Sequence, residues 1–152
     1  MDMYVVCESR RGKVHQAAAA IAEAAAAHGV ATLVRSIDEA VLDDLVAADF
    51  VITGCKLQSD TPFGGEPIRR MAEWINGLPA LDGLRVGVFC TYAFFPHIFA
   101  DVTARTSEAL AGLSAAFEAR GGKVVATQGL HQGELEGAAV SFVSTVLGDT
   151  EG

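Results

Sequence analysis

Short apolar runs alternate with longer stretches of helical character along the whole chain. The runs are rich in β-branched and aromatic residues, and the run at 49–54 is continuously apolar at its centre, as expected of a strand covered on both faces. The runs predict strands at residues 3–7, 30–35, 49–54, 85–91 and 123–127. The stretches between them predict helices at residues 15–28, at 36–47, from 66 onward, at 102–120 and at 134–147.

Residues with well-known preferences at helix ends mark these boundaries. Gly29 predicts a left-handed cap after the first helix, and Gly121-Gly122 closes the fourth. Ser36 and Glu39 have capping-box spacing, which predicts that the second helix opens there and runs to about Ala47. Pro67 is tolerated in the first turn of the third helix.

Strict alternation of strands and helices predicts the fold class. Strand–helix–strand crossovers make neighbouring strands parallel and place helices on both faces of the sheet. We therefore expect an α/β protein, a three-layer sandwich around a five-stranded parallel sheet. At 152 residues, the chain fits one domain spanning 1–152 better than two.

Composition and charge narrow the classes of partner. The chain is 51% hydrophobic and 20% charged, which is typical of a soluble globular domain. No apolar run approaches the roughly 20 residues that span a bilayer, and Met1-Asp2-Met3 lacks the basic segment of a secretory signal. We therefore expect a cytoplasmic protein without a membrane segment. A formal net charge of -8 argues against nucleic acid and suits a partner with a basic docking face.

The loop after the first strand contrasts with this acidic background. It contains three cations, Arg10, Arg11 and Lys13. The helix that follows offers unpaired amides and a positive dipole end, so these groups and the Ser9 hydroxyl could hold an anion such as phosphate. Gly12 would let the backbone approach it closely. An ordinary solvated turn with a Ser cap is the alternative interpretation.

Element order and the first loop together resemble the flavodoxin-like family. The resemblance rests on the first loop, Ser9-Arg10-Arg11-Gly12-Lys13-Val14, and on two strands. These are Phe50-Val51-Ile52-Thr53-Gly54, which is followed by a long loop, and Val86-Gly87-Val88-Phe89, which precedes another irregular loop. The resemblance implies strand order 2-1-3-4-5 and bound FMN, with its phosphate in the first loop. The match of that loop is partial, because Arg11 and Val14 stand where hydroxyl or amide donors are usual. Cationic side chains could offset that loss.

The resemblance also implies where the flavin would lie. The ring would lie between the loops after the third and fourth strands, where Phe63, Tyr92 and Phe94 are candidates for stacking. The predicted cofactor-binding residues are Ser9, Arg10, Arg11, Gly12, Lys13, Val14, Phe63, Thr91, Tyr92 and Phe94. Two alternatives remain for the aromatic loop: its later rings pack inward as the start of the fourth helix, or the loop forms a homodimer interface.

Three cysteines, Cys7, Cys55 and Cys90, fall at or just beyond the ends of the first, third and fourth strands. The predicted strand order makes those strands neighbours, so the sulfurs should reach one edge of the sheet. Buried packing is the first interpretation, since Cys is often a small core residue. A redox thiol at Cys55 and a metal site with His97 or His131 are the alternatives.

Other nucleotide-binding and hydrolytic classes lack their motifs. The chain has no Gly-x-Gly-x-x-Gly in the first loop, no P-loop and no Gly-x-Ser-x-Gly elbow. Three functions stay open. The first is an FMN-binding electron carrier with a redox partner protein, and the second is an FMN-dependent reductase that passes electrons from a nicotinamide to a small-molecule acceptor such as a quinone. The third is a flavin-free module for protein association or another ligand.

Overall fold

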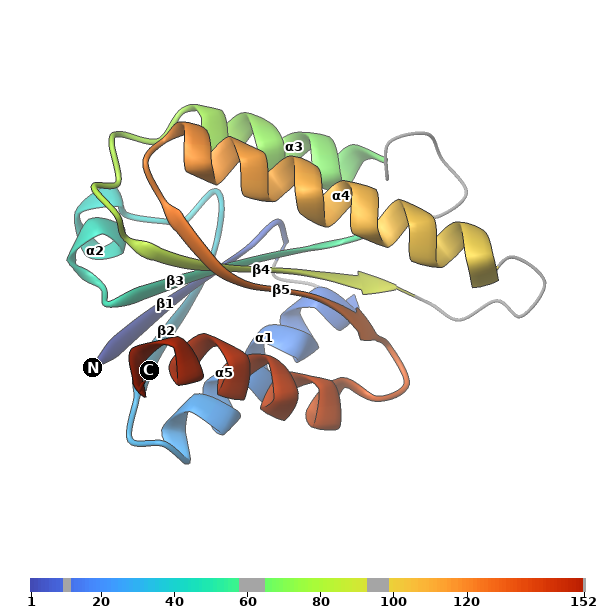
Figure 1. The fold of residues 1–152 in the computed structure, drawn as a ribbon, viewed down its shortest axis with the longest axis horizontal. Coiled ribbons are helices and arrows are strands. Elements are labelled where there is room, and N and C mark those ends of the chain that lie inside the picture. Colours follow the sequence, from blue (N-terminus) through green and yellow to red (C-terminus); the bar gives the residue numbers. More distant parts are fainter. Residues whose placement is uncertain (10–11, 58–64, 93–98, 152) are drawn as a thin grey trace.

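Five parallel strands form a single sheet in the order β2-β1-β3-β4-β5 (Figure 1). The computed structural model describes residues 1–9, 12–57, 65–92 and 99–151. The strands are β1 (Asp2–Cys7), β2 (Ala31–Ser36), β3 (Phe50–Lys56), β4 (Arg85–Tyr92) and β5 (Lys123–His131). The predicted α/β class and the predicted strand order are both confirmed.

Helices cover both faces of this sheet, which confirms the predicted three layers (Figure 1). They are α1 (Gly12–Ala26), α2 (Leu42–Ala47), α3 (Glu66–Asn76), α4 (Phe99–Ala119) and α5 (Leu135–Glu151). α1 and α5 lie side by side on one face, and α3 and α4 lie side by side on the other. None of these helices, over the residues described, is long and apolar enough to cross a membrane.

Alternation along β1 divides the core between the two faces. Met3 and Val5 pack beneath α1 and α5, whereas Tyr4 and Val6 pack beneath α2, α3 and α4. All four side chains are almost completely buried. A strand buried on both faces shows a continuous apolar run, which is the pattern that predicted β1 and β3.

The predicted start of the second helix is wrong. Ser36 is instead the last residue of β2, and α2 begins six residues later at Leu42. One bond of the capping-box type forms, because the Ser36 N–H donates to Glu39 Oε1 at 3.1 Å, and the Glu39 N–H donates to the Ser36 backbone carbonyl at 3.1 Å as in an ordinary turn. These two bonds close an isolated turn, because the chain directly after Glu39 does not continue as a helix.

Other boundaries differ by smaller amounts. α1 begins at Gly12 rather than at residue 15, and β5 continues to His131 rather than ending at Thr127. The predicted caps are confirmed: the Val30 N–H bonds to the Ala25 carbonyl at 3.0 Å past Gly29. The same bond across Gly121-Gly122 closes α4.

Candidate functional site

The carboxyl ends of β1 and β3 mark a switch point in the sheet. β1 leads into α1 on one face, and the chain after β3 leads to α3 on the opposite face (Figure 1). The two connections therefore diverge between adjacent strands. Open parallel sheets bind their ligands at such a switch point, outside the carboxyl ends of the strands.

The start of α1 follows β1 at this switch point. Gly12 opens α1 with a φ of +70°, a conformation that favours glycine, and a Cβ placed there would meet no atom of the described residues within 4 Å. That open space lies beside the helix N-terminus, where unpaired amides attract an anion. Lys13 is exposed, and its Nζ donates to Gln16 Oε1 at 3.3 Å. Arg10 and Arg11 lie outside the described residues.

Val14 contributes differently from the other residues of the predicted phosphate loop. Its side chain is buried in the core beneath α1, so it presents no side-chain donor to a ligand. Its carbonyl lies 4.0 Å from the Cys7 thiol. Any contribution of Val14 to anion binding therefore comes from its backbone N–H.

Thr91 supplies a buried hydroxyl at the same edge. It follows Phe89 on the sheet face that α1 and α5 cover, and it is in register with Leu130, which is also in that core. The residue is fully buried, and its Oγ1 has no hydrogen-bond partner among the residues described. A buried hydroxyl without a partner is costly, so a ligand that accepts or donates there would remove that cost.

His15, in the first turn of α1, has a similar unpartnered atom. Its Nδ1 is buried and has no hydrogen-bond partner in the described part of the chain. Nothing in the sequence singles out His15, because a histidine on a helix is usually a solvated residue. The unpartnered atom becomes apparent only when α1 is placed against the sheet.

Tyr92 ends β4 beside His131, the last residue of β5. The two rings meet edge to face, with centroids 5.5 Å apart and an interplanar angle of 63°. A cavity of about 800 Å³ reaches from this pair to Gln16 in α1 and to the start of α5. Tyr92 therefore lines a cavity that extends to the first turns of α1.

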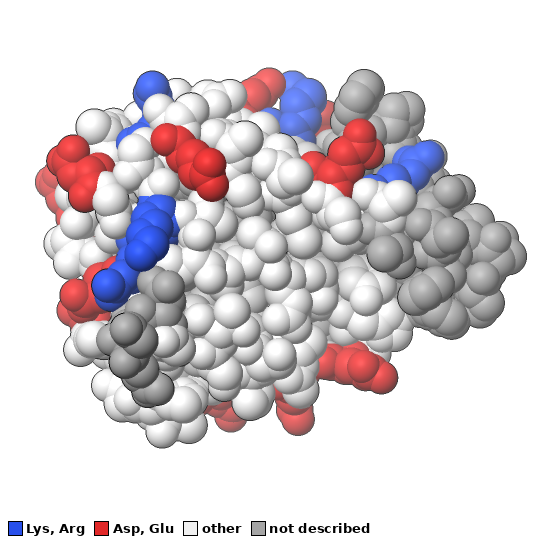
Figure 2. Space-filling model, in the orientation of Figure 1, with Lys and Arg blue, Asp and Glu red and all other residues white. Residues whose placement is uncertain are grey.

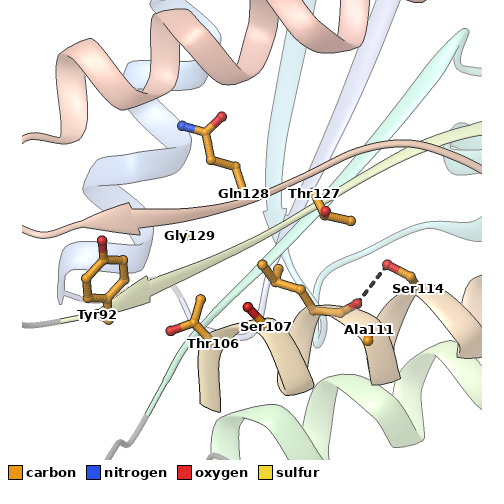
Figure 3. Close-up of a pocket in the computed structure, with 9 residues that line it drawn as sticks. Tyr92, Thr106, Ser107, Ala111, Ser114, Thr127, Gln128 and Gly129 are labelled. Carbon is orange, nitrogen blue, oxygen red and sulfur yellow. Dashed lines mark hydrogen bonds between the residues drawn. The ribbon is translucent and has the colours of Figure 1, made fainter. Parts of the chain in front are cut away.

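A second cavity of about 550 Å³ lies on the other side of Tyr92, between α4 and β5 (Figure 3). Its residues are mostly small and polar: Tyr92, Thr106, Ser107, Leu110, Ala111, Ser114, Thr127, Gln128 and Gly129. The Ser114 hydroxyl in this cavity already has a hydrogen-bond partner, because its Oγ donates to the Leu110 carbonyl at 2.7 Å. Tyr92 thus lies between two open spaces, and among the described residues no carboxylate or amine lines the second one.

Two of the predicted ring-binding residues, Phe63 and Phe94, lie outside the described residues. The same holds for His97 and for most of the aromatic loop after β4. Their proposed contact with a flavin stays a prediction. Of the predicted set, the described residues at this edge are Ser9, Gly12, Lys13, Val14, Thr91 and Tyr92.

The three cysteines reach one edge of the sheet but not one site. Cys7 faces α1 and α5, whereas Cys55 and Cys90 are register partners on the opposite face. Burial, with a smaller effect of the Glu8 charge, raises the pKa of Cys7 to about 12. Hydrogen bonding to Cys90, followed by burial, raises the pKa of Cys55 well above its ordinary value. These environments favour the packing interpretation, because a reactive thiol needs a lowered pKa and exposure.

Metal ligation finds no support in the same region. Within residues 1–9, 12–57, 65–92 and 99–151, no group of three His, Cys, Asp or Glu side chains is placed to hold an ion.

Glu8 is the least expected residue at this edge. It precedes the cationic loop, its side chain is only 10% exposed, and its Oε1 lies 2.6 Å from Arg70 Nη1 of α3. Arg70 Nη2 also lies 3.5 Å from Asp38 Oδ2 in the turn after β2. This Glu8–Arg70–Asp38 cluster joins three segments that are far apart in sequence, so no local motif could have indicated it.

Surface charge is spread rather than gathered on the face shown in Figure 2. Asp and Glu side chains lie around the periphery among Lys and Arg, and the middle of this face is uncharged. The net charge of -8 therefore does not form one acidic patch on this side of the molecule.

Comparison with solved structures identifies the fold. A short-chain flavodoxin associated with a PDU bacterial microcompartment superposes with a TM-score of 0.72 at 15% identity, covering 98% of both chains. A Streptococcus pneumoniae flavodoxin gives 0.70 at 15% identity, covering 98% of this chain and 99% of that one. Flavodoxin 1 from Bacillus cereus gives 0.70 at 16%, covering 97% and 98%. No protein-family model matches the chain, and no curated protein is similar in sequence.

Proposed function

We propose that this chain, which has the flavodoxin-like fold, binds FMN and carries electrons to a redox partner. One observation carries the proposal: at the carboxyl edge of the sheet, Gly12 opens α1 into free space after β1, and Thr91 has an unpartnered hydroxyl near the end of β4, on the face that α1 and α5 cover. Both features fit a phosphate-bearing ligand with a polar chain. Because flavodoxins have the same fold, we propose that this ligand is FMN.

Each described residue has a proposed role at this edge. Backbone amides from Gly12 to Val14 and the Ser9 hydroxyl would hold the phosphate, aided by the charge of Lys13. Thr91 would bond the ribityl chain, and Tyr92 would border the ring. Bound FMN would supply reversible one- and two-electron chemistry, while the chain supplies binding, orientation and exclusion of water.

A flavin titration tests this proposal. Purified protein should quench the fluorescence of added FMN to a 1:1 endpoint and should bind riboflavin more weakly. Lys13→Ala should weaken FMN binding about tenfold, because a charge-assisted contact contributes roughly 1.5–3 kcal/mol. Riboflavin, which has no phosphate, should be affected little.

Lys123→Ala is the matched control for this experiment. It removes the same charge at the amino end of β5, at the edge of the sheet opposite the carboxyl ends of the strands. FMN binding should stay at the parental level. Absence of FMN binding by the parent protein would refute the proposal and favour the flavin-free module.

A second candidate function is an FMN-dependent reductase of small acceptors. The cavity between α4 and β5 favours it, because Tyr92 lines that cavity as well as the one that reaches α1. An uncharged acceptor such as a quinone would suit walls of hydroxyl groups and small side chains. Oxidation of NAD(P)H by the FMN-loaded protein, with a quinone present, would distinguish this enzyme from a passive carrier.

A further inference from the structure

Glu8 comes directly before the proposed phosphate loop in sequence, and its carboxylate pairs with Arg70 of α3. Glu8 is 9% exposed, and its backbone N–H donates to the Gly54 carbonyl of β3 at 3.0 Å, which fixes the residue at the switch point. Its carboxylate then meets Arg70 at 2.6 Å. A nine-tenths buried carboxylate thus lies next in sequence to the Ser9 hydroxyl.

The charge of Glu8 acts on its surroundings. It contributes to the raised pKa of Cys7 on one face of the sheet and of Cys55 on the other. A buried negative charge at this position would also oppose a phosphate dianion in the adjacent loop, because charges interact strongly where water is excluded. Arg70 opposes that effect, since its guanidinium lies against the carboxylate.

We propose that the Glu8–Arg70 ion pair determines ligand specificity at this edge, by setting how much negative charge the first loop accepts. With the pair intact, the loop's amides and cations act on a phosphate without opposition from Glu8. With Arg70 removed, the uncompensated carboxylate selects against phosphate-bearing ligands and spares neutral ones. This inference rests on the proposed function where it names FMN as the ligand. The expected effect of the pair on a bound anion does not depend on that identity.

Affinities for FMN and riboflavin, measured side by side, test the inference. Arg70→Gln should weaken FMN about tenfold while riboflavin changes less than about threefold, as expected for one uncompensated charge in a partly buried site. Glu8→Gln should raise the FMN-to-riboflavin preference above the parental value. The double variant Glu8→Gln/Arg70→Gln should return FMN affinity to within about threefold of the parent, since it removes both charges.

Arg69→Gln is the matched control, one residue away in α3. Arg69 is exposed and pairs with Glu66 and Glu73 on the helix surface. Its replacement changes the net charge by the same amount but leaves Glu8 paired with Arg70. It should leave the FMN-to-riboflavin preference unchanged. An equal loss of both ligands in Arg70→Gln would overturn the inference in favour of a purely structural pair. An equal shift in Arg69→Gln would overturn it in favour of net charge.

Two further results keep this test separate from that of the proposed function. If Arg70→Gln does not fold, the preference of Glu8→Gln decides the question, because it keeps Arg70 in place. If the parent does not bind FMN, the proposed function fails and inorganic phosphate becomes the probe. Phosphate should then raise the melting temperature of the parent but not that of Arg70→Gln, and no rise in the parent would overturn the inference as well.

Discussion

Among the residues described, the buried hydroxyls of Thr32, Thr53 and Thr91 have no hydrogen-bond partner, and the two fully buried residues, Thr53 and Thr91, differ in where they lie. Thr91 is near the carboxyl end of β4, on the face covered by α1 and α5. Thr53 is in β3, in register with Val6 and Val88 on the opposite face. Only the position of Thr91 matches the proposed ligand site.

Replacing each threonine by valine should therefore separate ligand binding from folding. Both Thr91→Val and Thr53→Val should stabilise the ligand-free protein by about 1 kcal/mol, because each removes an unsatisfied buried hydroxyl at nearly constant volume. Only Thr91→Val should weaken FMN, by roughly fivefold to tenfold for one lost hydrogen bond. Urea unfolding and FMN titration measure the two effects, and unchanged FMN affinity in Thr91→Val would remove this residue from the site.

Residues of the site differ in how far the sequence could predict them. Ser9, Gly12 and Lys13 belong to one loop between a strand and a helix, so local pattern placed them together. Glu8 and Arg70 are 62 positions apart, and only the packing of α3 brings them within 2.6 Å. A single sequence carries no sign of such a contact.

At the scale of elements, α2 shows where local signals are insufficient. The Glu39 side chain bonds the Ser36 N–H as in a capping box, yet the helix begins at Leu42. A contact distant in sequence lies at its start, where the Val41 N–H donates to the Tyr4 hydroxyl of β1 at 3.0 Å. With only six residues, α2 depends on such tertiary contacts more than on its own propensity.

Tyr4→Phe should loosen α2 while leaving the rest of the fold intact. The substitution keeps the buried ring and removes the hydroxyl that satisfies a backbone N–H, so we expect a loss of about 1–2 kcal/mol of stability. Hydrogen exchange should speed up at residues 42–47 and stay unchanged in α1. Tyr92→Phe removes a hydroxyl from the other tyrosine and should leave exchange in α2 as it was; equal exchange in both variants would contradict a capping role for Tyr4.

The remaining elements were predictable because their signals agree at every level. β1 and β3 show continuous apolar runs, and the glycine caps after α1 and α4 match the bonds observed. The length of β5 was underestimated, since Gly129 is a residue typical of turns and the partners of Gln128 and Gly129 in β4 are distant in sequence. Boundaries that depend on such pairing require the assembled sheet.

At the scale of the whole molecule, net charge and its distribution have separate consequences. The formal charge of -8 creates an overall negative field, but the acidic side chains visible in Figure 2 are spread around the periphery. A spread charge steers an approaching partner through the total field of the protein rather than through one docking patch. Steering of this kind depends on ionic strength and little on any single acidic residue.

Electron transfer from the reduced, FMN-loaded protein should therefore follow the sign of the acceptor's charge. With cytochrome c, a basic protein, the second-order rate constant should fall roughly tenfold or more as the salt concentration rises from about 10 mM to about 300 mM, because screening shortens the reach of the field. Ferricyanide, a small anion, is the control, and its rate should rise over the same range. Stopped-flow absorbance of the flavin measures both reactions. A rate that falls for both acceptors would mean that salt acts on the flavin site itself, whereas no dependence for either would mean that the charge of this protein does not guide its partners.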